Sequence, residues 1–221
     1  MNEPPKFDGI LFDMDGTLID TVPFIVESFQ HTFKRHRVTD VSEAHILASI
    51  GTPLESYLRQ FADGNVKDLV ETYTQFNELW MKQAIAVFLG VPAMLDQLRA
   101  IPVKVGVVTA KRRLSAMLTL NIFGLDHDFD AIIVKEDTRK HKPHPEPLLL
   151  AMEQLNLTDP ARVLYVGDSV HDIKSAHAAG CAACAVRWSR MPHEDLEAEN
   201  PHFWANKAHD IVDIAVGGLK V

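Results

Sequence analysis

The spacing of hydrophobic residues changes twice along the chain. Residues 7–12 end in a short apolar run, which is typical of a buried strand. Between residues 21 and 88 the apolar residues recur every three or four positions, which predicts helices. From residue 90 onward, short apolar runs alternate with stretches of helical spacing. The pattern therefore predicts an α/β protein in which a helical segment separates the first strand from the remaining strands and helices.

The helical segment divides into four predicted helices, and no strand is expected inside it. These helices are expected at residues 21–36, after Ser42, at 54–62 and at 65–86. In the last of them, the spacing predicts a buried apolar stripe that consists of Leu69, Tyr73, Phe76 and Trp80. The run Gly51-Thr52-Pro53 breaks the helical pattern, and such a loop lets the backbone approach a ligand. We therefore expect Thr52 to face the functional site.

The second part of the chain alternates predicted strands with predicted helices. Further strands are expected at residues 103–108, 131–134, 163–166 and 182–186, with a weak one at 202–205. Helices are expected at residues 92–100, 114–122, 145–155, 170–179 and 209–216. Apolar strands that alternate with helices form a parallel sheet with helices on both faces. The ligands of such sheets bind beyond the carboxyl ends of the strands.

Composition narrows the class of protein. The chain has 221 residues, of which 47% are hydrophobic and 24% are charged, as is usual for a globular protein with a full core. Its net charge of -8 argues against nucleic acid as a partner. Because no apolar run approaches about 18 residues, no membrane span is expected. The start of the chain also lacks the features of a signal peptide, so we expect a cytoplasmic protein.

The two cysteines, Cys181 and Cys184, have the spacing of a redox pair or of half a zinc site. The sequence contains no second pair of this kind, and both residues lie at the entry to a predicted strand. We interpret them as small buried residues. This usage fits a reducing cytoplasm.

Charged and hydroxyl side chains follow the predicted strands. They are Asp13 and Asp15 after the first strand, Thr109 after the second, Lys142 beyond the third, Asp168 after the fourth, and Asp172 in the next helical turn. Because parallel strands end at one edge of the sheet, these side chains are expected to converge. Two like charges about 4 Å apart repel by roughly 4 kcal/mol at an effective dielectric of about 20, so four carboxylates and one lysine need a further cation. Oxygen ligands favour Mg²⁺ over zinc.

A site of this composition suits phosphoryl transfer. A divalent ion, a lysine and a hydroxyl group can together hold a phosphoryl group. An aspartate beside the ion can attack phosphorus and form an aspartyl-phosphate. A second carboxylate can protonate the leaving oxygen and then activate water. The residue types alone therefore indicate a phosphatase.

Four strings in the chain resemble, in order, the four signature motifs of the haloacid dehalogenase-like hydrolases. They are DMDGTLID, VVT at residues 107–109, KP at 142–143 and GDSVHD at 167–172. The resemblance spans almost the whole chain. It implies a Rossmann-like α/β core domain formed by residues 1–18 and 87–221, with a helical cap domain inserted at residues 19–86.

The resemblance also implies a role for each residue of the first three motifs. Asp13 matches the nucleophile, which is also a ligand of Mg²⁺. Asp15 matches the general acid and base, whose backbone carbonyl binds the metal. Thr109 matches the hydroxyl group that binds the transferring phosphoryl group, and Lys142 matches the lysine of the third motif.

Two residues of the fourth motif complete the implied metal site. Asp168 matches a metal ligand, and Asp172 matches the carboxylate that supports both the metal and the lysine. The chain departs from the family at Ala110, where many relatives carry a polar residue. Ala110 is expected to contact the substrate together with Thr109, Lys142 and Thr52.

Asp15 distinguishes among members of the family. Dehalogenases lack the second acid of the first motif and phosphonate hydrolases carry alanine there, so Asp15 points to phosphoryl chemistry. The strings SFQHTF, IGTPL, HKPHPEPL and VGDSVHDI most resemble the phosphoglycolate phosphatase and pyrophosphatase group. The resemblance therefore implies a small phosphorylated substrate, with 2-phosphoglycolate and inorganic pyrophosphate as the leading candidates. We expect a monomer or a homodimer.

Two other functions stay open at this point. A sugar phosphomutase of the β-phosphoglucomutase type would share the fold, but its second motif is rich in serine, whereas this chain reads VTAK. A non-catalytic phosphate-binding module on the same fold would have no need of Asp15. Isomerisation of a sugar phosphate would identify the first alternative, and the intact pair of aspartates in the first motif argues against the second.

Overall fold

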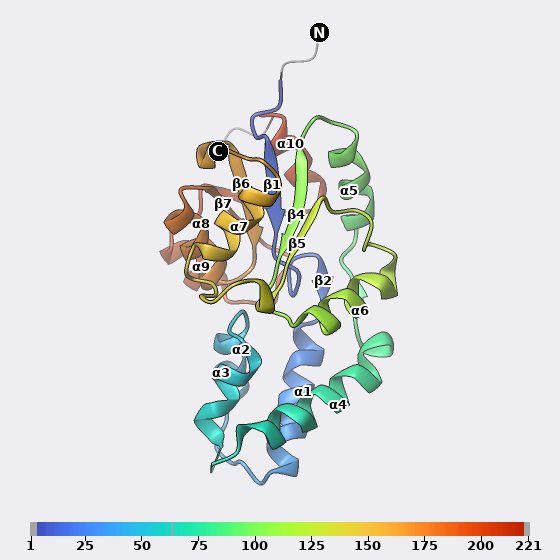
Figure 1. Ribbon diagram of the computed structural model, residues 1–221, viewed down its shortest axis with the longest axis vertical. Coiled ribbons are helices and arrows are strands. Elements are labelled where there is room, and N and C mark those ends of the chain that lie inside the picture. The colour runs from blue at the N-terminus through green and yellow to red at the C-terminus, as the bar shows by residue number, and fades with distance from the viewer. Residues whose placement is uncertain (1–3, 63, 219–221) are drawn as a thin grey trace.

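The computed structural model of the protein describes residues 4–62 and 64–218. Figure 1 shows two parts that lie end to end along the long axis of the molecule. We name the part that contains the large sheet the core, and the part formed by the helices between residues 22 and 84 the cap. The domain boundaries at residues 18/19 and 86/87 stay a prediction. Residues 1–3, 63 and 219–221, which that division includes, lie outside the described residues.

The core is built on a six-stranded sheet in which neighbouring strands are parallel. Its strands are β1 (Gly9–Phe12), β4 (Lys104–Val108), β5 (Ala131–Ile133), β6 (Val163–Gly167), β7 (Ala182–Val186) and β8 (Phe203–Ala205). Their order across the sheet is β5-β4-β1-β6-β7-β8. The predicted α/β class with a parallel sheet is therefore confirmed, and so is the weak strand near residue 203.

Helices cover both faces of this sheet. The core helices are α5 (Val91–Arg99), α6 (Arg113–Phe123), α7 (Glu146–Gln154), α8 (Val170–Ala179), α9 (His193–Ala198) and α10 (His209–Ala215), with 3₁₀ turns η2 (Lys135–Asp137) and η3 (Pro160–Arg162). Ile10 and Phe12 of β1 pack with residues of α5, α6 and α10. Leu11 points to the other face and packs with residues of α7 and α8. This alternation is what a buried strand requires, because successive side chains point to opposite faces.

The register of the sheet brings the ends of its central strands together. Phe12 of β1 pairs with Val107 of β4 on one side and with Val166 of β6 on the other. The Asp13 backbone N–H then donates to the Val166 carbonyl at 2.9 Å, so the pairing continues one residue beyond β1. The residues that follow β1, β4 and β6 therefore share one edge of the sheet, and this edge faces the cap (Figure 1).

The cap has a hydrophobic core of its own. Its elements are α1 (Val22–Arg35), α2 (Glu43–Ser49), α3 (Leu54–Leu58), the 3₁₀ turn η1 (Arg59–Phe61) and α4 (Val66–Ala84). Phe29 and Phe33 of α1 lie against Tyr57 of α3 within this cluster. Ser42 caps α2 as expected, because its side chain accepts the backbone N–H of His45. The helix predicted at residues 54–62 is shorter than expected, since the chain tightens into η1 after Leu58.

A two-stranded antiparallel ribbon joins the cap to the core. It consists of β2 (Ile19–Asp20) and β3 (Ala86–Val87), with Ile19 paired to Val87. The prediction that no strand lies between residues 21 and 88 is therefore wrong at β3. A strand of two residues is too short to produce a periodic pattern, so its identity depends on the partner strand.

The buried stripe predicted for α4 is wrong at its end. Trp80 is 49% exposed, whereas Asn77 and Met81 are 7% and 1% exposed. The first half of α4 packs against α1, but Met81 belongs to the hydrophobic cluster of the core and accepts a hydrogen bond from Thr119 of α6. The buried face therefore shifts along the helix, because the two halves of α4 pack against different neighbours.

Cys181 precedes β7 and Cys184 lies within it, and both are buried free thiols. Burial raises the pKa of the Cys181 thiol to about 12, and burial together with the Asp210 charge raises that of Cys184 as well. Both thiols are therefore protonated at neutral pH, as expected for residues that serve packing. Within the described ranges, no helix has the length and apolar character needed to cross a membrane.

Candidate active site

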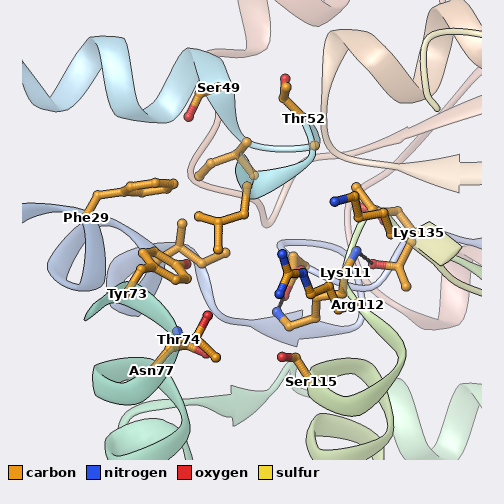
Figure 2. Close-up of a pocket in the computed structure, with 18 residues that line it drawn as sticks. Phe29, Ser49, Thr52, Tyr73, Thr74, Asn77, Lys111, Arg112, Ser115 and Lys135 are labelled. Atoms are coloured by element: carbon orange, nitrogen blue, oxygen red, sulfur yellow. Dashed lines mark hydrogen bonds and ion pairs between the residues drawn. The ribbon is translucent and has the colours of Figure 1, made fainter. Parts of the chain in front are cut away.

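A pocket opens between the carboxyl edge of the sheet and the cap. The core contributes residues that follow β1, β4 and β5, which are Asp13, Asp15, Thr109, Ala110, Lys111, Arg112, Ser115 and Lys135. The cap contributes the residues Ile25, Phe29, Ser49, Ile50, Gly51, Thr52, Leu54, Tyr73, Thr74 and Asn77. Figure 2 shows these two groups on opposite sides of the pocket. The structure thus brings Asp13, Asp15, Thr109, Ala110 and Thr52 together, although they lie far apart in the sequence.

Asp13 is the first residue after β1, and only 5% of its surface is exposed. Its Oδ1 atom accepts a hydrogen bond from Lys142 Nζ at 2.7 Å. Burial, together with the nearby Asp172 and Asp15 charges, raises the pKa of Asp13 to about 7, even though Lys142 opposes this shift. Without a further cation, the surroundings therefore disfavour the charged form of this side chain.

Asp15 has different partners from Asp13, because the chain turns sharply between residues 14 and 19. The turn is made at Gly16, which has a φ of +80°, and the Leu18 and Ile19 N–H groups both donate to the Met14 carbonyl. The Asp15 carboxylate accepts a hydrogen bond from the Thr21 hydroxyl at 2.7 Å. It also forms an ion pair with Lys111. Simple alternation along a strand would have placed both carboxylates in the same surroundings.

Lys142 holds several groups together beneath the pocket. Its side chain is almost fully buried, and Nζ donates to Asp13 Oδ1 and Asp172 Oδ1, both at 2.7 Å. Its third short contact, at 3.0 Å, is with the hydroxyl oxygen of Tyr165. Burial alone would lower the pKa of Lys142, but the Asp13 and Asp172 charges outweigh burial and raise it well above its ordinary value. The lysine is therefore a permanent cation that fixes one oxygen of each aspartate.

Asp172 is fully engaged by hydrogen bonds. Its Oδ1 atom accepts Lys142 and the Tyr165 hydroxyl, and Oδ2 accepts both the N–H and the hydroxyl of Ser169. Ser169 in return caps α8, which fixes the start of that helix. Burial favours the neutral acid, but Lys142 and Ser169 outweigh it and lower the pKa of Asp172. The arrangement gives Asp172 a clear part in positioning Lys142.

Asp168 is completely buried and only half satisfied. Its Oδ2 atom accepts the Ser189 hydroxyl at 2.6 Å, whereas Oδ1 is buried without a hydrogen-bond partner among the described residues. Burial is the main cause that raises its pKa well above the ordinary value, and the Asp172 and Asp13 charges add to it. A buried carboxylate oxygen without a partner is costly, so its presence indicates that something else binds there.

The acidic residues fit a divalent cation. Asp13, Asp168 and Asp172 each offer an oxygen, and these oxygens lie within 4.8 Å of one another. Lys142 supplies one positive charge for the three carboxylates, so an ion such as Mg²⁺ would restore the balance. The open oxygen of Asp168 is the donor that such an ion would take first. The predicted set of Asp13, Asp15, Asp168 and Asp172 as ligands stays a prediction.

Three residues of the site were missed by the sequence interpretation. Lys111 binds the Asp15 carboxylate, Tyr165 binds Lys142 and Asp172, and Ser189 binds Asp168. A signal existed for two of them. Lys111 lies two residues beyond Thr109, and Tyr165 is the one hydroxyl-bearing residue of an otherwise aliphatic strand, VLYVG. Ser189 lies in the loop after β7, where the sequence offers no pattern that points to Asp168.

The comparison with known proteins places this site in a family. The family model described as haloacid dehalogenase-like hydrolase matches residues 10–186. The protein is therefore a hydrolase, and it belongs to the haloacid dehalogenase-like hydrolase family. The four motifs found in the sequence all lie within the matched residues, so the resemblance is confirmed.

Relatives of this chain carry phosphatase names. A protein named "Putative pyrophosphatase PpaX" from Caldanaerobacter subterraneus subsp. tengcongensis is 36% identical over 212 residues, which is 96% of each chain. Pyrophosphatase PpaX from Bacillus cereus (strain Q1) is 34% identical over 209 residues, which is 95% of this chain and 96% of that protein. The crystal structure of "a predicted phosphoglycolate phosphatase" from Haemophilus somnus superposes with a TM-score of 0.82 at 25% identity, covering 95% of this chain and 98% of that one.

Proposed function

We propose that the protein is a Mg²⁺-dependent phosphatase that moves the phosphoryl group of a small metabolite onto Asp13 and then hydrolyses the aspartyl-phosphate. The observation that supports this most is the division of labour between two aspartates in one pocket. Asp13 is held by the buried cation Lys142, whereas Asp15 is held by Thr21 and Lys111. A nucleophile and a separate proton carrier are the two groups that this reaction needs.

In the first step, an oxygen of Asp13 attacks phosphorus as the bond from phosphorus to the leaving oxygen breaks. Asp15 gives its proton to that leaving oxygen. Lys142 holds the other oxygen of Asp13, so the attacking carboxylate cannot rotate away. The Thr109 hydroxyl lies in the pocket beside these groups and would hold an oxygen of the phosphoryl group.

In the second step, Asp15 takes a proton from water as that water attacks phosphorus, and the bond from Asp13 to phosphorus breaks. Asp13 is then restored as a carboxylate beside Lys142. Asp13 and Asp168, with the Asp15 carbonyl, would hold Mg²⁺, which when bound neutralises the negative charge of the carboxylates and the phosphoryl oxygens. Asp172 and Tyr165 hold Lys142 in place through both steps.

The names of the relatives select the first substrates to test. Several relatives are named as pyrophosphatases, and a structural neighbour is named as a phosphoglycolate phosphatase. Inorganic pyrophosphate and 2-phosphoglycolate are therefore our leading candidates. Both are small molecules in which a phosphoryl group is joined to a second anionic group.

The test is a phosphate-release assay with Mg²⁺ on a panel that contains both candidates, sugar phosphates and nucleotides. We expect rapid turnover of at least one of the two candidates. Asp13→Asn should lower kcat by about ten-thousand-fold or more, because the nucleophile is removed. The matched control is Asp8→Asn, since Asp8 is an exposed aspartate paired with Arg162 outside the pocket. Full activity in Asp13→Asn would contradict the assigned nucleophile.

A further inference from the structure

The core side of the pocket carries three cations close to one another. Lys111 and Arg112 follow β4, and Lys135 begins η2 after β5. The Lys135 backbone N–H donates to the Lys111 carbonyl at 2.9 Å, which ties the two loops together. Figure 2 shows the three side chains on one side of the pocket, across from Phe29 and Tyr73. We name Lys111, Arg112 and Lys135 the cationic wall.

The carboxylates of the candidate active site do not neutralise all of these cations. Lys142 already serves Asp13, and Lys111 serves Asp15. Arg112 reaches Glu55 of α3 at only 4.0 Å, and Glu55 itself binds Arg59 at 2.8 Å. Within the described residues, Lys135 has no carboxylate within 4.0 Å of its side-chain nitrogen. In a protein with a net charge of -8, this local excess of positive charge needs an explanation.

The opposite side of the pocket is lined by uncharged side chains in the part of the cap that the structure describes. The residues that the cap contributes are all uncharged, with five large apolar or aromatic side chains among them, namely Ile25, Phe29, Ile50, Leu54 and Tyr73. We name the ten cap residues of the pocket the cap wall. An anionic group beyond the phosphoryl group can therefore be matched only on the core side.

We infer that the cationic wall binds a second anionic group, one carried by the leaving group of the substrate. This inference rests on the proposed function, and it deepens it by naming the chemical class: a phosphate ester or anhydride whose leaving group bears a carboxylate or a phosphate. Lys111 would share its positive charge between Asp15 and that group, while Arg112 and Lys135 would donate charge-assisted hydrogen bonds to it. A neutral leaving group of the same size would leave the wall unmatched.

The test compares two pairs of substrates that differ in this charge. The first pair is 2-phosphoglycolate and 2-hydroxyethyl phosphate, in which a hydroxymethyl group replaces the carboxylate. The second pair is pyrophosphate and acetyl phosphate, which are both anhydrides and in which a neutral acetyl group replaces the second phosphate. For the wild-type protein with Mg²⁺, we expect kcat/KM to be about tenfold to a hundredfold higher for the anionic member of at least one pair.

Variants then assign the preference to the wall. Arg112→Gln and Lys135→Gln should each lower kcat/KM for the anionic substrate by about tenfold while changing it less than about threefold for the neutral one. The matched control is Arg113→Gln, because Arg113 is the next residue along and is exposed, paired with Asp137 and outside the pocket. The ratio between two substrates is measured in one sample, so a fraction of misfolded protein does not affect it.

Each outcome has a definite meaning. A wild-type protein that prefers the neutral member of both pairs, or hydrolyses them equally, overturns the inference and leaves the proposed function standing. Variants that lower both members of a pair to the same extent also overturn it. If the wild-type protein hydrolyses none of the four compounds and no other phosphate ester of the panel, the proposed function fails first and the inference fails with it.

Discussion

The two sides of the pocket are built on different principles. On the core side, charged and polar groups hold one another: Lys142 alone links Asp13, Asp172 and Tyr165, while Asp15 and Asp168 each have a separate set of partners. On the cap side, the pocket is lined by apolar, hydroxyl and amide side chains, and the apolar ones belong to the separate hydrophobic cluster of the cap. A network of buried charges tolerates little change, whereas a wall of neutral side chains can be reshaped at small cost. In the proposed function, chemistry and charge recognition therefore belong to the core, and shape recognition belongs to the cap.

After the loss of the nucleophile in Asp13→Asn, the largest expected effect comes from adding a single methyl group on the core side. A Cβ atom at Gly16 would lie 2.0 Å from Asp168 Oδ2 and 2.7 Å from Asp168 Cγ, so Gly16→Ala must displace the buried carboxylate. We expect kcat to fall by more than about a hundredfold, because the acidic site loses its geometry. Phosphate release under saturating Mg²⁺ measures this loss.

Gly124→Ala is the control for that substitution. Gly124 also has a positive φ, of +68°, but among the described residues no non-neighbouring atom lies within 4 Å of the position its Cβ would occupy. The alanine should cost about 1 kcal/mol of stability through backbone strain alone and leave kcat unchanged. Equal activity in the two variants would show that the core side is more tolerant than the comparison claims.

The next effect concerns metal and pH. Folding raises the pKa of Asp13 and of Asp168, so without metal the folded state binds protons there more tightly than the unfolded state does. The stability that comes from this proton binding is fully present below about pH 4, and for Asp13 it is lost as pH rises through about 7. Protons and Mg²⁺ compete for the same oxygens, so Mg²⁺ should raise Tm more at about pH 8 than at about pH 5. At a hundredfold excess over Kd the stabilisation is about 2.7 kcal/mol, which corresponds to roughly 5–10 °C.

Thermal unfolding with and without EDTA measures this shift. Asp168→Asn is expected to remove most of it, because the open oxygen of Asp168 is lost. Asp210→Asn is a control at another buried aspartate, whose partners are the N–H groups of Asn206 and Lys207 outside the pocket. A shift of the same size at both pH values would contradict the assignment of the raised pKa values to the metal site.

A smaller effect is expected from the hydroxyl group of Tyr165. This group is within hydrogen-bonding distance of Lys142 Nζ, Asp172 Oδ1 and the Val108 carbonyl. Tyr165→Phe should lower kcat by about tenfold with little change in KM, because Lys142 loses a neighbour that fixes its position and the substrate is not contacted. Steady-state kinetics separates the two parameters.

Tyr57→Phe is the matched control in the cap. The Tyr57 hydroxyl is buried without a hydrogen-bond partner among the described residues, so its removal should leave both stability and kcat the same or slightly higher. If Tyr165→Phe raised KM and left kcat unchanged, Tyr165 would have to contact the substrate. Tyr165 would then be part of the pocket surface and not of the buried network around Lys142.

The smallest effect is expected on the cap side. Thr52 lies in the loop between α2 and α3 and lines the pocket. Thr52→Val should change KM by about threefold for some substrates and leave kcat nearly constant, because Thr52 has no part in the proposed chemical steps. Thr39→Val is the control, since Thr39 is exposed, lies outside the pocket and donates its hydroxyl hydrogen bond to Asp40. No change with any substrate would remove Thr52 from the recognition surface.

The parts of the fold that are determined by a local sequence pattern could be predicted from the sequence. The strands that precede Asp13, Thr109 and Asp168 are short apolar runs followed by a polar residue. This pattern can be recognised without knowing which elements pack against the strand. The exposure of Trp80 could not be predicted in this way, because α4 changes its packing partner halfway along. Strand β3 exists only because β2 lies beside it.

The same reasoning explains which site residues were found. Carboxylates at strand ends can be recognised in the sequence, because an acidic residue directly after a buried apolar run is an unusual pattern. The role of Tyr165 could not be predicted, because aromatic residues are common in buried strands. Its hydroxyl group matters only because Lys142, which lies in a loop distant in the sequence, contacts it in the folded protein. Lys111 was likewise given no role from the sequence, although the loop after β4 places it on Asp15.

The ribbon of β2 and β3 has a consequence for how such a protein can change over evolutionary time. The chain leaves the core at Ile19 and returns at Val87, and these two residues are paired neighbours. The segment between them can therefore be lengthened, shortened or exchanged without altering the spacing of any strand in the large sheet. A recombination event within this segment, beyond Thr21, which holds Asp15, would replace the whole cap wall and leave Asp13, Asp15 and Lys142 in place, so a new substrate shape would be acquired in a single step while the reaction stayed the same.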